Sequence, residues 1–589
     1  MGCSVINVAD YIMKFLESKG VKCAFQVPGG GAMFLNDAVE KSNIQPIFCH
    51  HEQACAMAAV GYSKVNNEVS LVVPTSGCGS TNTITGILDA WQDSHPIIVV
   101  SGQANKKDTT YLSPLPLRKL GVQEVNIIEI VKSITKFSTM VTNPEDIAVV
   151  MEKAFHIATS GRPGPIWIDV PLDVQSSLID ESALSHWVED IVSEDIDVVD
   201  DFEIFLKNSK RPIVIAGNGI NLASARKEFI RFVEKYNLPC AFTFLATDLL
   251  EAEHPLNIGR LGIKGTRAGN FAVANSDLVI SIGSSLSIPV IGYRYEFFAR
   301  EAKKFVVDID KNEHLKETIK IDKILQMDAR KFLVSNMEHD YSASRFWQDK
   351  CLHWKNKWNV FDREDIEELN MYSFSKKLSS LTKDINSVII SDAGSAYYVM
   401  AQSAFNSRII LPGAQGEMGF TLPASVGVSL ADENLNVFGI TGDGSFQFNI
   451  QELQTIVQNR LPIKIVVLNN SGYLSIKNTQ KKYFNERYSG TDANSGISFP
   501  DCSKIAKAYG MKYFRINEPE HLDTVLPEVV KYDSFCICEV MCPDSENIVP
   551  TAASRQNPNG KIVSQPLENM SPFLSDEDFK QEMIIKPIE

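Results

Sequence analysis

Asp443 and Asn470 stand where a parallel sheet would bind a ligand. The segment 442–470 reads GDGSFQFNIQELQTIVQNRLPIKIVVLNN, and apolar, strand-like runs occupy 437–440 and 463–468. Between the two runs, a helical pattern places apolar side chains on one face, at Phe448, Leu453, Ile456 and Val457. The polar groups therefore follow the C-terminal ends of two predicted strands, which is where open parallel sheets bind ligands.

The chemistry of this segment favours a diphosphate together with a divalent metal. Gly444 and Ser445 open the predicted helix, whose free N–H groups and positive dipole end can face phosphate. The Asp443 carboxylate and the Asn470 amide oxygen are hard donors that suit Mg²⁺. For this segment alone, a plain strand–helix–strand unit with a chance GDG and a chance NN stays an alternative.

The N-terminal half repeats the pattern of apolar strand followed by polar or glycine-rich loop. Pro28–Gly31 follows the strand 22–27, and Glu52 starts a helix after the strand 44–49. TSGCGSTN occupies 75–82 after the strand 70–74, and Gly102-Gln103 follows the strand 97–101. Taken singly, PGGG could be a tight turn, and Glu52 could merely stabilise a helix N-terminus. The alternation of strands and helices predicts a doubly wound parallel sheet.

In combination these motifs resemble a known family. GDG at 442–444 followed by NN at 469–470 is similar to the signature of thiamine-diphosphate enzymes. The order PGG, HEQ, TSGxGxTN and SGQ, continuing through GVQE at 121–124 and SGRPGP at 160–165, resembles the acetolactate synthase group of those enzymes. The resemblance implies an α/β protein of three doubly wound parallel-sheet domains. These are a pyrimidine-binding domain at 1–185, a central Rossmann-like domain at 204–340 and a diphosphate-binding domain at 371–545.

The remaining segments connect or follow these domains. Residues 186–203 are acidic and are predicted to form a solvated linker. The tail 546–589 keeps apolar residues such as Leu567, Phe573 and Leu574, too many for a free tail. We expect it to pack against the rest of the protein, as a lid over the active site.

The resemblance also assigns site residues. Glu52 matches the carboxyl group that donates to the aminopyrimidine ring of the cofactor, and Gln123 and Gly30 match catalytic positions near the reacting atoms. The metal ligands would be Asp443, Asn470 and the Gly472 carbonyl. Met418 would hold the two cofactor rings in a bent arrangement, although Met also fills ordinary cores. The cofactor-binding set implied is Met418, Gly416, Gly394, Ser395, Gly444, Ser445, Asn470, Tyr473 and Leu474.

The implied cofactors are thiamine diphosphate and Mg²⁺. The implied reaction is decarboxylation of a 2-oxo acid, with pyruvate as the default donor, and transfer of the resulting carbanion to a carbonyl acceptor. A non-ligating decarboxylase or C–C hydrolase on the same fold stays an alternative. So does a regulatory paralogue that binds cofactor without turnover, although such a module would have no need of Glu52.

Several positions depart from the acetolactate synthase pattern. Leu172 replaces a Lys, Val122 replaces a Phe, and Ser475 and Thr479 stand where a Met and a Trp are usual. The acceptor pocket should therefore be remodelled and roomier. The sequence YLSI at 473–476 and the long tail resemble the branch that transfers a two-carbon unit to nucleotide-linked keto-sugars. We take such a sugar as the hypothetical acceptor.

The central domain offers little support for a second cofactor. GNG at 217–219 is half of a dinucleotide fingerprint and is weak evidence for NAD. The loop 284–289 reads SSLSIP and lacks the arginines found after this strand in the FAD-binding acetolactate synthases. We therefore expect no FAD.

Composition limits the partners. The net charge of −15 argues against a general nucleic-acid binder. The sequence contains no uncharged apolar run of 18 residues, so no membrane span is expected. Charged residues interrupt the N-terminal apolar residues, so no signal peptide is expected. The 11 cysteines are scattered, and the cluster Cys536, Cys538 and Cys542 is predicted to be buried thiols in a reducing cytoplasm. The resemblance implies a homodimer or homotetramer with active sites at the subunit interface.

Overall fold

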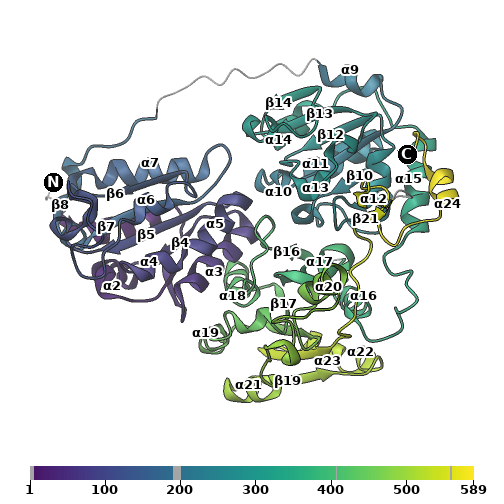
Figure 1. Ribbon diagram of the computed structural model, residues 1–589. Helices are drawn as coiled ribbons and strands as arrows, with labels where there is room; N and C mark the ends of the chain where they lie inside the picture. Colours follow the sequence, from purple (N-terminus) through teal and green to yellow (C-terminus); the bar gives the residue numbers. More distant parts are fainter. Residues whose placement is uncertain (1–4, 190–200, 406, 557–559, 561, 589) are drawn as a thin grey trace.

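The computed structural model describes residues 5–189, 201–405, 407–556, 560 and 562–588. It contains three six-stranded sheets, each with helices on both faces (Figure 1). All pairings within these three sheets are parallel, which confirms the predicted fold class. Among the described residues, no helix combines the length and apolarity that crossing a membrane would need.

The first sheet has the strand order β3-β2-β4-β5-β7-β6. Its strands are β2 (Cys23–Gln26), β3 (Gln45–Phe48), β4 (Ser70–Val73), β5 (Ile97–Gln103), β6 (Phe137–Met140) and β7 (Ile166–Pro171). The helices are α1 (Val8–Ser18), α2 (Met33–Lys41), α3 (Glu52–Asn66), α4 (Cys78–Asn82), α5 (Ile84–Asp93), α6 (Ile127–Val131), α7 (Ile147–Thr159) and α8 (Leu172–Gln175). A ribbon of β1 (Val5–Asn7) and β8 (Leu178–Asp180) joins the two ends of this unit. The central strands are fully buried because helices cover both faces.

The last sheet has the order β16-β15-β17-β18-β20-β19. Its strands are β15 (Ser387–Ser391), β16 (Arg408–Ile410), β17 (Asn436–Gly442), β18 (Lys464–Asn469), β19 (Lys512–Ile516) and β20 (Cys536–Met541). The helices are α16 (Met371–Leu381), α17 (Gly394–Ser403), α18 (Thr421–Ala431), α19 (Glu452–Gln458), α20 (Leu474–Tyr483), α21 (Cys502–Ala508), α22 (His521–Thr524) and α23 (Leu526–Lys531). Counted from its own first strand, this order matches that of the first sheet. In both sheets the order in which strands are added reverses between the first and third strands of the unit. This place is called the switch point, and ligands of parallel sheets bind there.

The central sheet follows a different order, β11-β10-β9-β12-β13-β14, which is the order of dinucleotide-binding domains. Its strands are β9 (Pro212–Ala216), β10 (Cys240–Phe242), β11 (Asn257–Arg260), β12 (Leu278–Ile282), β13 (Lys303–Asp308) and β14 (Lys323–Gln326). The helices are α9 (Asp201–Lys207), α10 (Gly219–Leu222), α11 (Arg226–Tyr236), α12 (Arg267–Ala274), α13 (Ile288–Ile291), α14 (Ala329–Ser335) and α15 (Arg345–Lys357).

At the switch point of the central sheet, the loops after β9 and β12 touch each other. The N–H of Gly219 donates to the carbonyl of Gly283 at 2.9 Å. A Cβ at Gly217 would lie 2.1 Å from the same carbonyl oxygen. The glycines of the GNG motif therefore allow two loops to meet, and this contact accounts for their presence without a dinucleotide.

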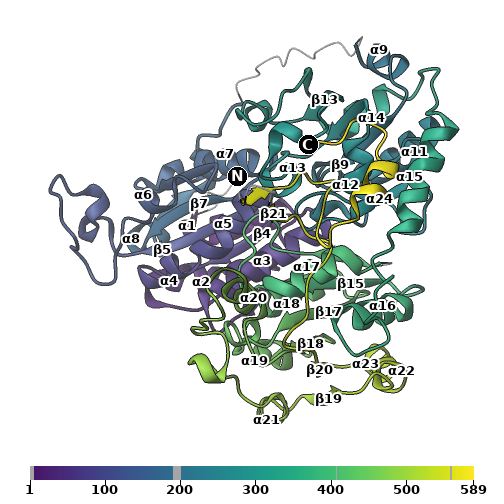
Figure 2. The ribbon, with the colours of Figure 1, turned by 45° about the vertical axis from the view of Figure 1, so that its right-hand side comes forward.

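The tail folds onto the central domain after leaving β20. It forms a ribbon of β21 (Ser554–Gln556) and β22 (Ile562–Ser564) and ends in α24 (Asp576–Glu582), which lies beside α12 and α15 (Figures 1 and 2). Leu567 is buried in the core on this side of the central sheet, with Leu574, Phe579 and Met583 packed against it. The prediction that the tail packs against the protein agrees with this arrangement.

Two local predictions were wrong. Phe448 does not share a buried helical face with Leu453, because the chain makes a 3₁₀ turn at Ser445–Gln447 and α19 begins only at Glu452, which leaves Phe448 53% exposed. Asp201, placed in the acidic linker, begins α9 instead. Residues 190–200 of that linker lie outside the described residues.

Candidate active site

Asp443 joins the ends of β17 and β18. Its Oδ1 accepts a hydrogen bond from Gly444 N at 2.8 Å, and its Oδ2 accepts one from Gly472 N at 3.0 Å. The residue is 3% exposed. Burial raises the pKa of Asp443 to about 6, although these backbone donors act in the opposite direction. The loop between β18 and α20 is thus held against the GDG turn.

Asn470, in the same loop, carries an unsatisfied acceptor. The residue is 9% exposed, and its Oδ1 is buried without a hydrogen-bond partner. A buried acceptor without a partner is costly unless a ligand completes it. Among the described residues, no cluster of three or more His, Cys, Asp or Glu side chains could hold a metal. A divalent ion here would rest on Asp443, Asn470, backbone oxygens and phosphate, which is a donor set that suits Mg²⁺.

The phosphate-binding candidates surround the same turn. A Cβ at Gly444 would lie 2.1 Å from Cε1 of Tyr473, so only glycine leaves room for that ring. Across the switch point, the hydroxyls of Ser395 and Ser475 are hydrogen-bonded at 3.3 Å, which brings the start of α17 to the start of α20. Gly394 has φ of +74°, a conformation that favours glycine. Leu474 is buried at the first position of α20.

Asp392 belongs to this group, although the sequence did not single it out. Its Oδ2 accepts a hydrogen bond from Ser445 Oγ at 2.7 Å, and Ser445 Oγ in turn accepts one from Gly419 N at 2.8 Å. Burial raises the pKa of Asp392 to about 6. The Ser445 hydroxyl therefore fixes the backbone beside Met418. Gly416, two residues earlier, has φ of +63°. The available signal was a strand ending in Asp-Ala-Gly at the switch point.

Glu52 lies in the first domain, at the start of α3. Its Oε2 accepts a hydrogen bond from Asn82 Nδ2 at 2.9 Å. A Cβ at Gly79 would lie 3.5 Å from Glu52 Oε1 and 2.7 Å from the Thr75 side chain. Thr75 Oγ1 also accepts a hydrogen bond from Gly31 N at 3.1 Å. The loops after β2, β3 and β4 thus meet at one edge of the first sheet.

Gln123 and Gly30 complete this edge. Gln123 has φ of +53°, and its carbonyl oxygen lies 2.4 Å from where a Cβ would stand on Gly77. Gly77 itself has φ of +65°, so glycine is required twice over at that position. Gly30 is exposed, with no atom within 4 Å of a built Cβ. The edge carrying Glu52, Gly30 and Gln123 is therefore open at its outer side.

The first and third domains of one chain meet through residues beside Glu52. Glu452 accepts a hydrogen bond from His50 N at 3.1 Å, and Asn449 Nδ2 donates to Gln53 Oε1 at 3.4 Å. Among the described residues, Glu52 itself makes no hydrogen bond to the third domain. The candidate residues thus form two groups, one at each switch point.

Comparison with known proteins gives the class of this protein. The family described as "Thiamine pyrophosphate enzyme, N-terminal TPP binding domain" matches residues 6–130, and the corresponding central domain matches 200–335. The C-terminal TPP binding domain of the same enzymes matches residues 392–540. The protein is therefore a thiamine-diphosphate-dependent enzyme, and both groups of candidate residues lie within its two cofactor-binding domains.

Full-length relatives narrow the class. The chain is 31% identical over 571 residues to the acetolactate synthase isozyme 2 large subunit of Escherichia coli (strain K12), covering 96% of this chain and 100% of the relative. It is 32% identical over 556 residues to the acetolactate synthase large subunit of Lactococcus lactis, covering 92% and 93%. A probable acetolactate synthase large subunit of Methanocaldococcus jannaschii is 31% identical over 561 residues, covering 91% and 92%. The chain belongs to the acetolactate synthase-like thiamine-diphosphate enzymes.

Proposed function

We propose that this enzyme, with Mg²⁺ and thiamine diphosphate, decarboxylates pyruvate and transfers the two-carbon unit to the keto group of a nucleotide-linked sugar. The proposal rests on the observation that small polar side chains on α20 line a large cavity. Ser475 and Thr479 stand one helical turn apart, are exposed, and line a cavity of about 2030 Å³ that also reaches Ser395. A large polar acceptor needs such space beside the diphosphate candidates.

The residues present suit the cofactor. Bound thiamine diphosphate would supply a carbon nucleophile and an electron sink for decarboxylation. Asp443, Asn470 and the Gly472 carbonyl would hold the metal, and the unpartnered Asn470 Oδ1 supports this. Gly394, Ser395, Gly444 and Ser445 would hold the diphosphate. Met418 would hold the two rings in a bent arrangement, and Gly416, Tyr473 and Leu474 complete the implied cofactor-binding set.

Glu52 would act on the aminopyrimidine end of the cofactor. Its carboxyl group would hold a proton at the ring nitrogen it faces, with Asn82 fixing the other carboxyl oxygen. Gly30 and Gln123 stand on the same open edge and would border the reacting atoms.

We propose that two chains share each site. The loop between β5 and α6, residues 104–126, stands out from the first domain (Figure 2). It exposes a row of large apolar side chains, which is costly unless another surface covers them: Leu112 48%, Leu115 62%, Leu117 40%, Leu120 48% and Val122 80%. A second copy covering this loop would also close the open edge at Gly30 and Gln123.

A product assay tests the reaction. Purified protein with Mg²⁺, thiamine diphosphate and pyruvate is incubated with and without nucleotide-linked keto-sugars, and products are identified by mass. The expected result is a product two carbons larger than the sugar and slow turnover with pyruvate alone. Fast acetolactate formation from pyruvate alone would refute the proposed acceptor. Release of free aldehyde without a coupled product would identify a decarboxylase instead.

Complementation tests the shared site. Glu52→Gln and Asp443→Ala subunits are each expected to be inactive. If each site takes Glu52 from one chain and Asp443 from the other, a mixed dimer keeps one intact site. Random mixing should then restore about a quarter of the wild-type activity. Restoration of none, with mixed dimers verified by mass, would place both residues of a site in one chain.

We also propose that FAD does not bind at the switch point of the central sheet. The loop 284–289, SSLSIP, supports this, because it lacks the arginines that follow the corresponding strand in the FAD-binding acetolactate synthases. An absorption spectrum near 450 nm tests the point, recorded on the purified protein and again after incubation with FAD and removal of unbound FAD by gel filtration; a retained flavin band would refute it.

A further inference from the structure

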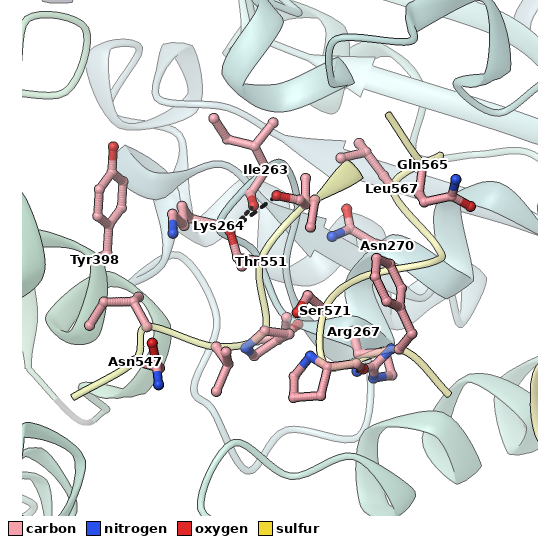
Figure 3. Close-up of a pocket in the computed structure, with 18 of the residues that line it drawn as sticks. Ile263, Lys264, Arg267, Asn270, Tyr398, Asn547, Thr551, Gln565, Leu567 and Ser571 are labelled. Carbon is pink, nitrogen blue, oxygen red and sulfur yellow. Dashed lines mark hydrogen bonds between the residues drawn. The ribbon is translucent and has the colours of Figure 1, made fainter. Parts of the chain in front are cut away.

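The cavity beside α20 has walls from three parts of the chain. The central domain contributes the loop 261–267, the third domain contributes α17 and α20, and the tail contributes residues within 543–554 and 564–574 (Figure 3). Its volume of about 2030 Å³ is larger than a small 2-oxo acid requires.

The loop that carries Lys264 is fixed on both sides of that residue. Ile263 O accepts hydrogen bonds from Ala552 N at 2.7 Å and from Thr551 Oγ1 at 3.4 Å, the latter drawn in Figure 3. Lys264 O accepts a hydrogen bond from Gln402 Nε2 at 2.8 Å. The backbone of Lys264 is therefore positioned by the tail and by α17 before any ligand arrives.

The ammonium group of Lys264 lacks an acceptor. Among the described residues it donates no hydrogen bond, and it lies 5.3 Å from the centre of the Tyr398 ring. Burial, and then the charge of Lys482 on α20, lower the pKa of Lys264 to about 8. Both lysines line the cavity, and the positive charge of Lys482 disfavours the protonated form of Lys264.

Several other charged groups of the cavity are already engaged. Arg267 donates to the carbonyls of Met570 and Pro572, and Lys477 pairs with Asp544 at 2.8 Å. Some carboxylates are paired likewise, Glu568 with Arg300 and Asp365 with Arg363. Among the described residues, no ion pair engages the lining carboxylates of Asp362, Glu364, Glu368 and Glu486. Among the described lining residues, Lys264, Lys481 and Lys482 are cations without an ion pair, and Lys264 is the half-buried one while Lys481 and Lys482 are exposed.

We propose that Lys264 and Lys482 bind the diphosphate of the nucleotide carried by the acceptor. The inference rests on the proposed function, and it specifies which residues recognise this class of substrate. A diphosphate would supply an acceptor for the half-buried Lys264 ammonium group and a charge-assisted contact for the exposed Lys482 ammonium group. The sugar end could then extend along the same cavity toward Ser475.

Direct binding tests the inference without turnover. The protein is first saturated with Mg²⁺ and thiamine diphosphate, so that the cofactor site cannot take the probe. Calorimetry then measures UDP, CDP, GDP and ADP, with inorganic pyrophosphate and FAD for comparison. At least one nucleoside diphosphate should bind, and Lys264→Gln and Lys482→Gln should each weaken it about 10- to 100-fold.

A matched control separates local from general charge effects. Lys303, whose side chain is 67% exposed and paired with Asp322, lies in the same domain outside the cavity. Lys303→Gln should leave the affinity unchanged. Retained cofactor binding and an unchanged circular dichroism spectrum would show that the Lys264→Gln protein is folded. Equal affinities of wild type and Lys264→Gln for every probe would overturn the inference.

The remaining outcomes distinguish the inference from the proposed function. Binding that depends on Lys264, without turnover of any nucleotide-linked keto-sugar, would support the diphosphate site and overturn the proposed reaction. Turnover of such a sugar with the same KM in Lys264→Gln would leave the reaction standing and overturn the site. FAD binding that depends on Lys264 and exceeds that of every nucleoside diphosphate would assign the site to a dinucleotide and overturn the acceptor assignment.

Discussion

Glu582, in the last turn of α24, should act as the latch that holds the tail on the central domain. Its side chain is only 6% exposed and accepts hydrogen bonds from Lys350 and Lys357, each at 2.8 Å. Trp354 Nε1 donates to it at 2.9 Å, and His353 lies within 3.0 Å. Burial alone would raise the pKa of Glu582, but the hydrogen bonds from the lysines and His353 outweigh it and hold the pKa well below its usual range.

The magnitude follows from these contacts. A hydrogen bond to a charged group contributes about 1.5–3 kcal/mol, but the lysine side chains are 23% and 37% exposed, so solvent screens part of the gain. We therefore expect Glu582→Ala to cost about 2–4 kcal/mol of local stability. Amide exchange in α24 should accelerate roughly 30- to 900-fold. A carboxyl group whose pKa is lowered by folding stabilises the folded state at every pH above its unfolded pKa. The contacts of Glu582 should therefore persist at pH 5 and be lost only as the pH falls through the pKa of the folded state.

Hydrogen exchange followed by mass spectrometry measures this effect directly. Glu577 lies on the exposed side of the same helix, so Glu577→Ala is the matched control for changes in helix propensity. Glu582→Gln should give an intermediate rate, because it keeps an acceptor for the Trp354 indole but loses the charge. If α24 exchanges equally fast in the Glu582→Ala and Glu577→Ala proteins, the latch is refuted.

Three further predictions concern the sites. Glu52→Gln should lower turnover about 10²- to 10⁴-fold while calorimetry detects nearly unchanged cofactor affinity; normal turnover would defeat the assigned role. Asn470→Ala should weaken Mg²⁺-dependent cofactor binding about 10- to 100-fold, yet leave the metal-free melting temperature nearly unchanged, because its Oδ1 has no partner to lose; a large drop in melting temperature would indicate a structural role. Affinity for the bound nucleoside diphosphate should fall about tenfold from pH 7 to pH 9. The reason is that Lys264, which lies near the Lys482 charge and the Tyr398 ring, loses its proton near pH 8. An equal loss of affinity over this pH range in the Lys264→Gln protein would contradict this.

The parts of the site that local sequence predicted are those that depend on strand ends. Asp443 and Gly472 follow two adjacent parallel strands, so their contact follows from the sheet alone. Asp392 was missed because its importance arises from hydroxyl groups of Thr441 and Ser445, which belong to another part of the chain. A buried carboxylate with hydroxyl partners leaves no periodic signal in the sequence.

The segment after GDG shows where prediction from local sequence fails. Its apolar spacing predicts one continuous helix, but Ser445 is held by Asp392 and Asn449 is held by the Gly419 carbonyl at 2.8 Å. These side-chain bonds fix a 3₁₀ turn and postpone the α-helix to Glu452. Long-range hydrogen bonds thus overrode a local helical pattern, and Phe448 was left at the surface, where a second subunit could cover it.

The strand order of each of the three sheets determines where its candidate residues lie. The first and third sheets share one strand order, and each collects its candidate residues at the reversal of that order. The central sheet has the dinucleotide-binding order, and at its reversal point the backbones of Gly217 and Gly283 are in close contact. Space for a nucleotide exists on the side of this domain where the loop carrying Lys264 meets α20 and the tail. A nucleotide-bearing acceptor would therefore use the central domain through that loop, without the crevice that gives such domains their usual ligand.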